Sequence, residues 1–266
     1  MYVHEVYEMK YRAFCGVAAA VFVSGAVCVA TEGDGESEAR ERKAKISVGA
    51  GAIVTSKPYR GTNARVYPVP MFSYEGRRFY FRGVAAGYRL FEGANWSLAP
   101  VLSPRFDGYD ENDSSALWGM DDRDVSLDAG LAFTLRGDWG VFGAALVTDV
   151  LGKHDGQELE LSYSKPLRWE KWTIAPALGL HWQSSNLVDY YYGVRAKEEL
   201  AGRRPAYDAD EAVNPFVALR VQRRLGKKWN VLGAIQYEWF DDEISDSPIV
   251  DDNYDISVIT GVLYTF

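Results

Sequence analysis

The sequence predicts an all-β protein: a transmembrane, antiparallel, up-and-down β-barrel that follows a cleaved signal peptide. Three observations predict this fold, namely an apolar N-terminal segment, many runs of alternating apolar and polar residues, and a last strand that ends on the aromatic Phe266. Aromatic residues make up 14% of the chain and glycine is frequent at 25 residues, a mixture that favours strands and turns.

The N-terminal segment is typical of an export signal. Residues 13–23 contain no polar side chain, and the first charged residue after them is Glu32. Cys28-Val29-Ala30 is a cleavage site of the kind that signal peptidase accepts, with the cut after Ala30. A membrane anchor is the alternative, but a span needs roughly 20 apolar residues and this segment is marginal. We therefore predict a signal peptide over residues 1–30.

The acidic residues Glu5 and Glu8 do not fit the positively charged start of a signal peptide. Translation from Met9 would place Met-Lys-Tyr-Arg directly before the apolar segment, so we expect Met9 to be the true start. Residues 31–44 have no aromatic and no β-branched apolar residue, and we expect a flexible leader of mixed charge there. The barrel then occupies residues 45–266.

From residue 45 onward apolar residues recur with a period of two, which sends alternate side chains to opposite faces of a strand. In residues 172–182 and 229–239 the apolar face begins and ends with a tryptophan. Transmembrane strands are about 9–11 residues long, with aromatic girdles at both interfaces. The opposite faces are small or polar, as a narrow lumen requires. The predicted polar lining comprises Asp128, Arg136, Gln183, Gln236 and Glu238.

The alternating runs give the number of strands. They lie near 45–55, 66–75, 78–90, 96–106, 124–136, 139–149, 157–164, 172–183, 213–225, 229–240 and 254–266. This is an odd number, whereas a bacterial single-chain barrel has an even one. Either 78–90 splits in two or part of 187–194 makes a short strand. We therefore predict twelve strands, with ten as the alternative.

The connections between the runs predict the orientation in the outer membrane. Short connections at 136–139, 166–171 and 226–228 alternate with long ones at 107–123, 184–212 and 241–253. Barrels have short periplasmic turns and longer outside loops. We therefore expect the long acidic loops outside the cell and the C-terminus at the periplasmic rim.

Little in the sequence points to catalysis. The two cysteines, Cys15 and Cys28, lie in the predicted signal, and the chain has no phosphate-binding glycine loop, His-Glu-x-x-His motif or cysteine metal cluster. A net charge of −8 makes it a poor nucleic-acid binder. His181 could pair with a barrel serine in a hydrolase, but no motif ties a serine to it. We expect no cofactor, no metal site and no catalytic residue, and a lumen role for His181.

Three loop segments carry motifs that generic barrel loops do not require. Their residues are Tyr191, Tyr192, Gly193, Val194, Pro205, Tyr207, Asp208, Asp246, Ser247, Pro248 and Ile249. Together they resemble the MipA/OmpV family of outer-membrane proteins, the MltA-interacting scaffolds, over about residues 46–266. The resemblance implies a scaffold that links a lytic murein transglycosylase to a bifunctional murein synthase. Other members of that family are described as adhesins.

The motif residues also have a structural interpretation, which we favour over direct partner contact. Gly193 would supply a turn with positive φ, Pro248 would rigidify a loop, and Tyr191 and Tyr207 would cover the barrel mouth. A small pore is an alternative function, because twelve strands enclose a narrow lumen. A surface adhesin that uses the long loops is another.

The C-terminal strand predicts recognition by the barrel-assembly machinery and insertion among outer-membrane lipids. Gly261, Tyr264 and Phe266 form the expected assembly signal. Ile259 departs from it, since a polar residue is usual two positions before Gly261.

Overall fold

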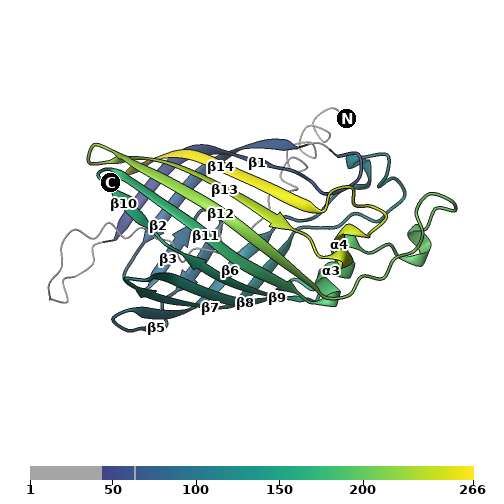
Figure 1. The fold of residues 1–266 in the computed structure, drawn as a ribbon, viewed down its shortest axis with the longest axis horizontal. Coiled ribbons are helices and arrows are strands. Elements are labelled where there is room, and N and C mark those ends of the chain that lie inside the picture. Colours follow the sequence, from purple (N-terminus) through teal and green to yellow (C-terminus); the bar gives the residue numbers. More distant parts are fainter. Residues whose placement is uncertain (1–43, 63) are drawn as a thin grey trace, which may run out of the picture.

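A computed structural model describes residues 44–62 and 64–266 of the chain, and it forms a closed antiparallel barrel (Figure 1). The strands are β1 Lys45–Thr55, β2 Arg65–Glu75, β3 Phe79–Arg82, β4 Ala85–Tyr88, β5 Phe91–Glu92, β6 Trp96–Arg105, β7 Ser126–Gly137, β8 Gly140–Asp149, β9 Gln157–Ser164, β10 Leu167–Trp169, β11 Trp172–Gln183, β12 Ala212–Leu225, β13 Trp229–Trp239 and β14 Tyr254–Thr265. The helices are α3 Ser185–Tyr192 and α4 Asp242–Ser245, with 3₁₀ turns at Glu111–Asp113 and Ala196–Glu198. Within the described ranges, no helix is long and apolar enough to cross a membrane.

The fourteen segments make twelve barrel strands. β4 and β5 both pair with β6, and β9 and β10 both pair with β11, so each of these pairs is one interrupted strand. The prediction of twelve strands is confirmed, and 78–90 splits at Gly83. The other route to twelve, a strand within 187–194, is wrong. Helix α3 forms there because its apolar residues share one helical face, which packs into a core.

The side chains alternate between lipid and lumen as the sequence predicts. On β11, Leu178 is 58% exposed on the outside, whereas His181 is 2% exposed inside. The predicted polar lining lies in the lumen, where Asp128, Gln183, Gln236 and Glu238 are buried and Arg136 lines the wall. An apolar belt outside and a polar lumen inside are the arrangement that a lipid bilayer requires.

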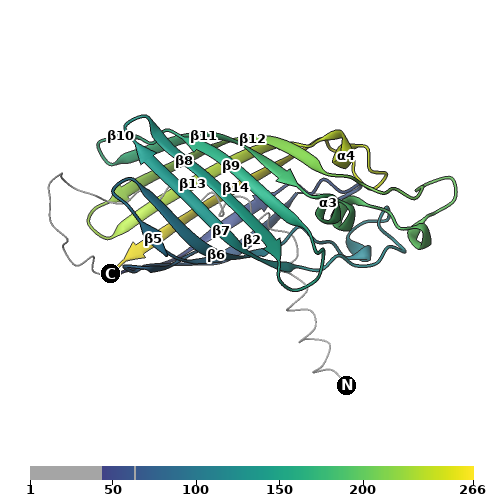
Figure 2. The ribbon, with the colours of Figure 1, turned by 90° about the horizontal axis from the view of Figure 1, so that it is seen from below.

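The two ends of the barrel differ. The loop end carries the long connections 106–125, 184–211 and 240–253, with α3 and α4, at the right of Figures 1 and 2. The turn end carries the short connections and the C-terminus, at the left of Figures 1 and 2. This is the predicted alternation of loop lengths. The predicted signal peptide, the Met9 start and all of the leader except Ala44 lie outside the described residues.

The barrel closes where β1 meets β14. Gly51 pairs with Gly261 across this seam, and the sulfur of Met71 lies over both glycines on the lumen side. Ile259 also faces the lumen, where it packs with Ile53 and Met71. An apolar residue is therefore accommodated at the unusual position of the assembly signal, because its lumen neighbours are apolar too.

The two aromatic residues of the expected signal lie in one cluster at the turn end. The ring of Tyr264 packs edge-on against Trp229 and against Phe266, each with ring centres 5.1 Å apart. Lys228 also donates a hydrogen bond to the Tyr264 hydroxyl, at 3.0 Å. The end of β14 is thus tied to the β12–β13 turn.

The closure seam yields a stability prediction. A Cβ atom at Gly49 would collide with the main-chain oxygen of Val262, so Gly49→Ala forces β1 and β14 apart. We expect it to destabilise the barrel by about 1–3 kcal/mol, as overpacking does. Urea unfolding, followed by heat-modifiable gel migration, measures this. Gly233→Ala is the matched control, because a Cβ there meets nothing closer than 3.8 Å. Equal stability of the two variants would contradict the role of the seam.

Candidate functional site: a capped acidic lumen

The long connections fold together over the loop end into a structure that we call the cap. Fourteen buried apolar side chains form one hydrophobic core. They come from these connections, including helices α3 and α4, and from residues 59 and 212. They are Tyr59, Tyr109, Leu117, Met120, Leu187, Val188, Tyr191, Tyr192, Val194, Ala209, Ala212, Ile244, Ile249 and Val250. The cap is therefore a packed lid, with a core like that of a water-soluble domain.

Tyr59 joins the cap to the strand that closes the barrel. It follows β1, and its ring packs edge-on against Tyr109, with ring centres 4.7 Å apart, and stacks on Tyr192 at 5.9 Å. Its hydroxyl donates to the main-chain oxygens of Asp107 at 3.0 Å and Tyr191 at 3.3 Å. Burial raises the pKa of Tyr59 well above its usual range, so the hydroxyl keeps its proton and remains a donor.

A buried ion pair locks two of the loops together. Arg123 donates two hydrogen bonds to the Glu198 carboxylate, at 2.9 and 3.0 Å, and both side chains are almost fully buried. Arg204 donates to the main-chain oxygen of Glu198 at 2.7 and 3.0 Å. Burial alone would raise the pKa of Glu198, but hydrogen bonds from Arg123 and from two backbone N–H groups lower it.

The family-motif residues meet in the cap. The main chains of Val194 and Tyr207 exchange hydrogen bonds of 2.8 and 2.9 Å, and the Ser247 hydroxyl donates to the oxygen of Tyr192 at 2.6 Å. Several motif residues belong to the cap core or pack against it, namely Tyr191, Tyr192, Val194, Tyr207 and Ile249. Others are exposed and contribute nothing to it, namely Pro205, Asp208 and Asp246. Pro248 is half-buried in the same loop as Ser247.

The backbone conformation of Gly193 differs from the one expected from the sequence. Its φ is −71°, so the predicted positive φ is wrong. The residue is needed for a different reason, because a Cβ there would collide with the carboxylate and the main-chain oxygen of Asp189. The Gly193 N–H donates to that main-chain oxygen at 2.9 Å and ends helix α3.

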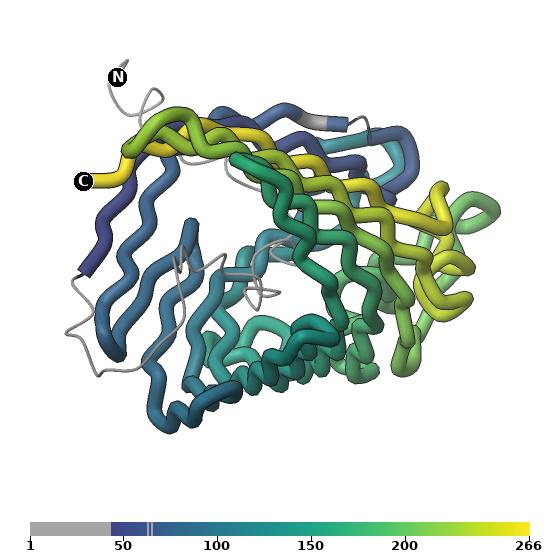
Figure 3. Tube along the Cα trace, turned by 60° about the vertical axis from the view of Figure 1, so that its left-hand side comes forward, coloured from purple at the N-terminus to yellow at the C-terminus, as the bar shows by residue number. Residues whose placement is uncertain are grey.

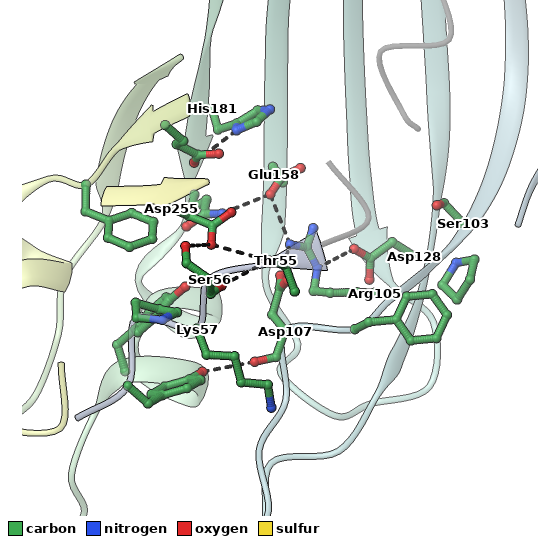
Figure 4. A pocket seen from close by; sticks show the side chains of 18 of the residues that line it. Thr55, Ser56, Lys57, Ser103, Arg105, Asp107, Asp128, Glu158, His181 and Asp255 are labelled. Atoms are coloured by element: carbon green, nitrogen blue, oxygen red, sulfur yellow. Dashed lines mark hydrogen bonds and ion pairs between the residues drawn. The ribbon is translucent and has the colours of Figure 1, made fainter. Parts of the chain in front are cut away.

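Beneath the cap the lumen widens into a chamber centred on Arg105 (Figure 4). Arg105 ends β6, and its guanidinium lies 2.8 Å from Asp128, 2.9 Å from Asp107 and 3.1 Å from Glu158. Of these four residues, only Asp128 was predicted from the sequence to line the lumen. The alternation Glu158-Leu159-Glu160-Leu161 on β9 was the signal that could have placed two of the carboxylates in the lumen.

Carboxylates outnumber cations in this chamber. Its acidic side chains are Asp107, Asp128, Glu158, Glu238 and Asp255. The cationic side chains in its described lining are Arg105, His181 and Lys57, and Lys57 pairs with Asp113. The hydroxyl of Ser103 in this lining, and one oxygen of Glu160 in the adjoining part of the lumen, are buried without a hydrogen-bond partner. The chamber therefore favours cations and repels anions.

His181 lies between carboxylates on the lumen face of β11. Its Nδ1 is 3.1 Å from Glu238, its Nε2 is 3.9 Å from Glu160, and its ring stacks on Phe216. Among the described residues, no serine hydroxyl is recorded in a hydrogen bond with it. The geometry fits a histidine that balances lumen charge.

A second cluster combines serine, histidine and aspartate but has the wrong arrangement for hydrolysis. His154 Nε2 is 3.1 Å from the Ser126 hydroxyl and 3.3 Å from Asp128, while its Nδ1 accepts the Gly156 N–H at 3.0 Å. Since Nδ1 is an acceptor, the neutral ring carries its proton on Nε2 and cannot take one from Ser126.

The same cluster has potential metal ligands in Asp128, Asp149 and His154. Asp149 accepts hydrogen bonds from the backbone N–H groups of Leu151, Lys153, His154 and Asp155. These ligand atoms already fix the 150–156 connection, so the residues do not fit a metal centre.

The ion pair of the cap yields a pH prediction. Because the pKa of Glu198 is lowered in the folded state, its stabilisation is present at neutral pH and is lost as the pH falls through that lowered value. We expect Glu198→Gln, which leaves Arg123 buried without its charge partner, to destabilise the cap by about 3–5 kcal/mol. Hydrogen exchange of residues 106–125 between neutral and acidic pH measures both effects. Glu199→Gln, in an exposed neighbour, is the control; unchanged exchange in Glu198→Gln would refute the role of the pair.

Comparison with known proteins places the chain in a family. Residues 48–266 match the model of a family described as MltA-interacting protein MipA. The MltA-interacting protein of Escherichia coli (strain K12) is 30% identical over 82% of this chain and 88% of its own length. YiaT of the same strain, whose name describes an outer membrane protein, is 33% identical over 82% of this chain and 89% of its own length.

Among solved structures, an outer membrane channel from Pseudomonas putida F1 aligns with a TM-score of 0.44 at 12% identity, over 88% of this chain and 100% of that one. The family match runs from residue 48, within β1, to the end of the chain, and the alignments with both relatives cover 82% of the chain. The chain is therefore a member of the MltA-interacting protein MipA family and an outer-membrane protein.

Proposed function

We propose that this protein is a non-enzymatic scaffold, which holds a murein-degrading lytic transglycosylase, and with it a murein synthase, at the periplasmic rim of its barrel. The observation that carries the proposal is the cap. A packed core and the buried Arg123–Glu198 pair close the loop end. The surface that remains for contact with periplasmic partners is the turn end.

The charge of the turn end supports a docking role. The turn-end segments at residues 76–78, 93–95, 138–139, 165–171 and 226–228 hold seven lysines and arginines against two acidic residues. The loops at the opposite end are acidic instead. Charge complementarity speeds encounter and fixes orientation, so this rim suits a partner with an acidic surface.

The relatives support the class of partner. One relative, at 30% identity, is named for its interaction with MltA. Most of the loop-motif residues are buried in or against the cap, so we assign partner contact to the turns and not to those motifs. The absence of a usable serine–histidine pair at His154 supports a role without catalysis.

A cation-selective pore is the second candidate, and the acidic chamber is the observation that favours it. The cap and the ion pairs around Arg105 oppose it, because they fill the route from the outside to the lumen. We expect no steady conductance from the purified barrel in planar bilayers. Regular single-channel steps would instead establish the pore.

The docking proposal predicts an effect of charge at the turn end. Lys171 and Lys227 lie exposed on neighbouring turns, since β11 pairs with β12. We expect Lys171→Glu with Lys227→Glu to lower the yield of a crosslinked lytic transglycosylase about tenfold, because the change repels an acidic partner. Mass spectrometry of crosslinked cell envelopes measures the yield. Arg203→Glu, in the exposed loop at the other end, is the control. A wild-type barrel that captures neither murein enzyme would overturn the proposal.

A further inference from the structure

On one side of the barrel, the wall is formed by the short β3–β4 hairpin, which does not reach the loop end. Each of these strands has only four residues. β2 pairs with β3 only through residues 73–75, and β4 pairs with β6 only through Ala86 and Gly87. Above the hairpin tip, residues 65–71 of β2 and 103–105 of β6 have no strand recorded between them in the described structure. We call this interval the notch; Figure 3 shows the hairpin as a short blue rise beside the long strands.

The direction of the main-chain groups at the notch follows from two hydrogen bonds. The oxygen of Phe72 accepts the N–H of Gly83 at 3.0 Å, so the even-numbered residues of β2 point their polar groups toward β3 and the notch. The oxygen of Leu98 accepts the N–H of Leu90 at 3.0 Å, so the even-numbered residues of β6 point toward the same gap.

Prolines occupy most of the positions whose N–H would face the notch. These positions are Val66, Pro68, Pro70 and Pro104. An unpaired N–H in hydrocarbon costs several kcal/mol, and proline has none to leave unpaired. Within β-sheets, proline is found on edge strands, at the first residue of a strand or at bulges. At the notch, β2 and β6 are edge strands. Proline thus removes three of the four N–H donors that would lack a strand partner along these two edges.

The outer surface around the notch is apolar. Val66 is 66% exposed, and Phe72, Val84 and Leu102 are also exposed on the outside of the wall. Pro68 and Pro70 are exposed beside them. Side chains of this kind on the outer face of a barrel contact lipid chains. The outer face of the notch is therefore bordered by side chains that contact lipid and not water.

The lumen wall behind the notch is apolar too. Ile53, Met71 and Ile259 form a buried cluster, against which Tyr67 and Val69 of β2 pack from one side of the notch. Phe106, which directly follows β6 on the other side, packs against the same cluster and also lines the chamber. An apolar surface thus continues from the outer wall through the notch into a lumen that is otherwise charged.

We propose that the notch is a lateral opening through which one acyl chain of a membrane lipid enters the lumen and lies against this apolar cluster. The occupant follows from the surroundings, because hydrocarbon chains are what the outer wall contacts at this place. The cap obstructs entry from the loop end, and the acidic chamber would repel an anionic headgroup. The headgroup therefore stays in the bilayer surface while the chain enters. This binding is independent of the scaffold role.

Photolabelling tests the opening directly. The full chain is reconstituted in phosphatidylethanolamine vesicles that contain a lipid with a diazirine at the middle of one acyl chain, and labelled peptides are mapped after illumination. We expect labels on the lumen-facing Tyr67, Val69 and Phe106, in addition to outward residues. Ala177 and Ala218, on the lumen face of β11 and β12, should stay unlabelled. Labels confined to outward-facing residues would overturn the proposal.

A matched pair of variants tests the path. Val69→Trp fills the space behind the notch and should lower labelling of Phe106 about fivefold, because the indole occupies the position of the acyl chain. Phe72→Trp places the same indole on the outer face of the same strand and should leave that labelling unchanged. Equal labelling of Phe106 in both variants would reject the path. If Val69→Trp does not fold, the wild-type map still decides the question.

Discussion

The structure depends on one constraint, that every backbone polar group inside a lipid bilayer needs a hydrogen-bond partner within the protein. β14 pairs with β1 along nine residue pairs and removes the two edges that an open sheet would expose. Glycines at the seam allow the two main chains to approach closely beneath Met71. Where the wall is interrupted, at the β3–β4 hairpin, the same constraint acts differently, and prolines take the place of the donors that would lack a partner.

The cap distributes its apolar and polar side chains in the opposite way from the barrel. The barrel shows its apolar side chains to lipid and keeps polar ones inside, whereas the cap buries apolar side chains and surrounds them with charge. The cap is made of connections far apart in the sequence, so it needs specific links. Arg123 and Glu198 supply one, and Tyr59 links the cap to β1. The buried residues of the family motifs, among them Tyr191, Val194 and Ile249, are where these connections pack together.

The chamber under the cap connects the two parts. Arg105 stands at the end of a barrel strand and holds carboxylates from two other strands and from the cap loop at Asp107. The lumen is therefore polarised, with an acidic chamber and an apolar wall of β1, β2 and β14 beside it. The packed cap at the loop end, the basic residues at the turn end and the apolar inner wall are the features on which the proposed scaffold role and the proposed lipid binding rest.

The sequence by itself determined the barrel, because each strand meets lipid on one face and the lumen on the other, so the alternation of its own side chains is sufficient. The predicted strands at 45–55, 157–164 and 172–183 have the observed bounds, and the even strand number followed from closure. Only the tertiary structure decided the cap, the helix α3, the packing role of Gly193 and the chamber around Arg105. The residues that contact one another in these features, such as Arg123 and Glu198, are 75 positions apart in the sequence. Contacts over such distances produce no periodic pattern in the local sequence. The notch likewise appears only when strand pairing shows which edges remain without a neighbour.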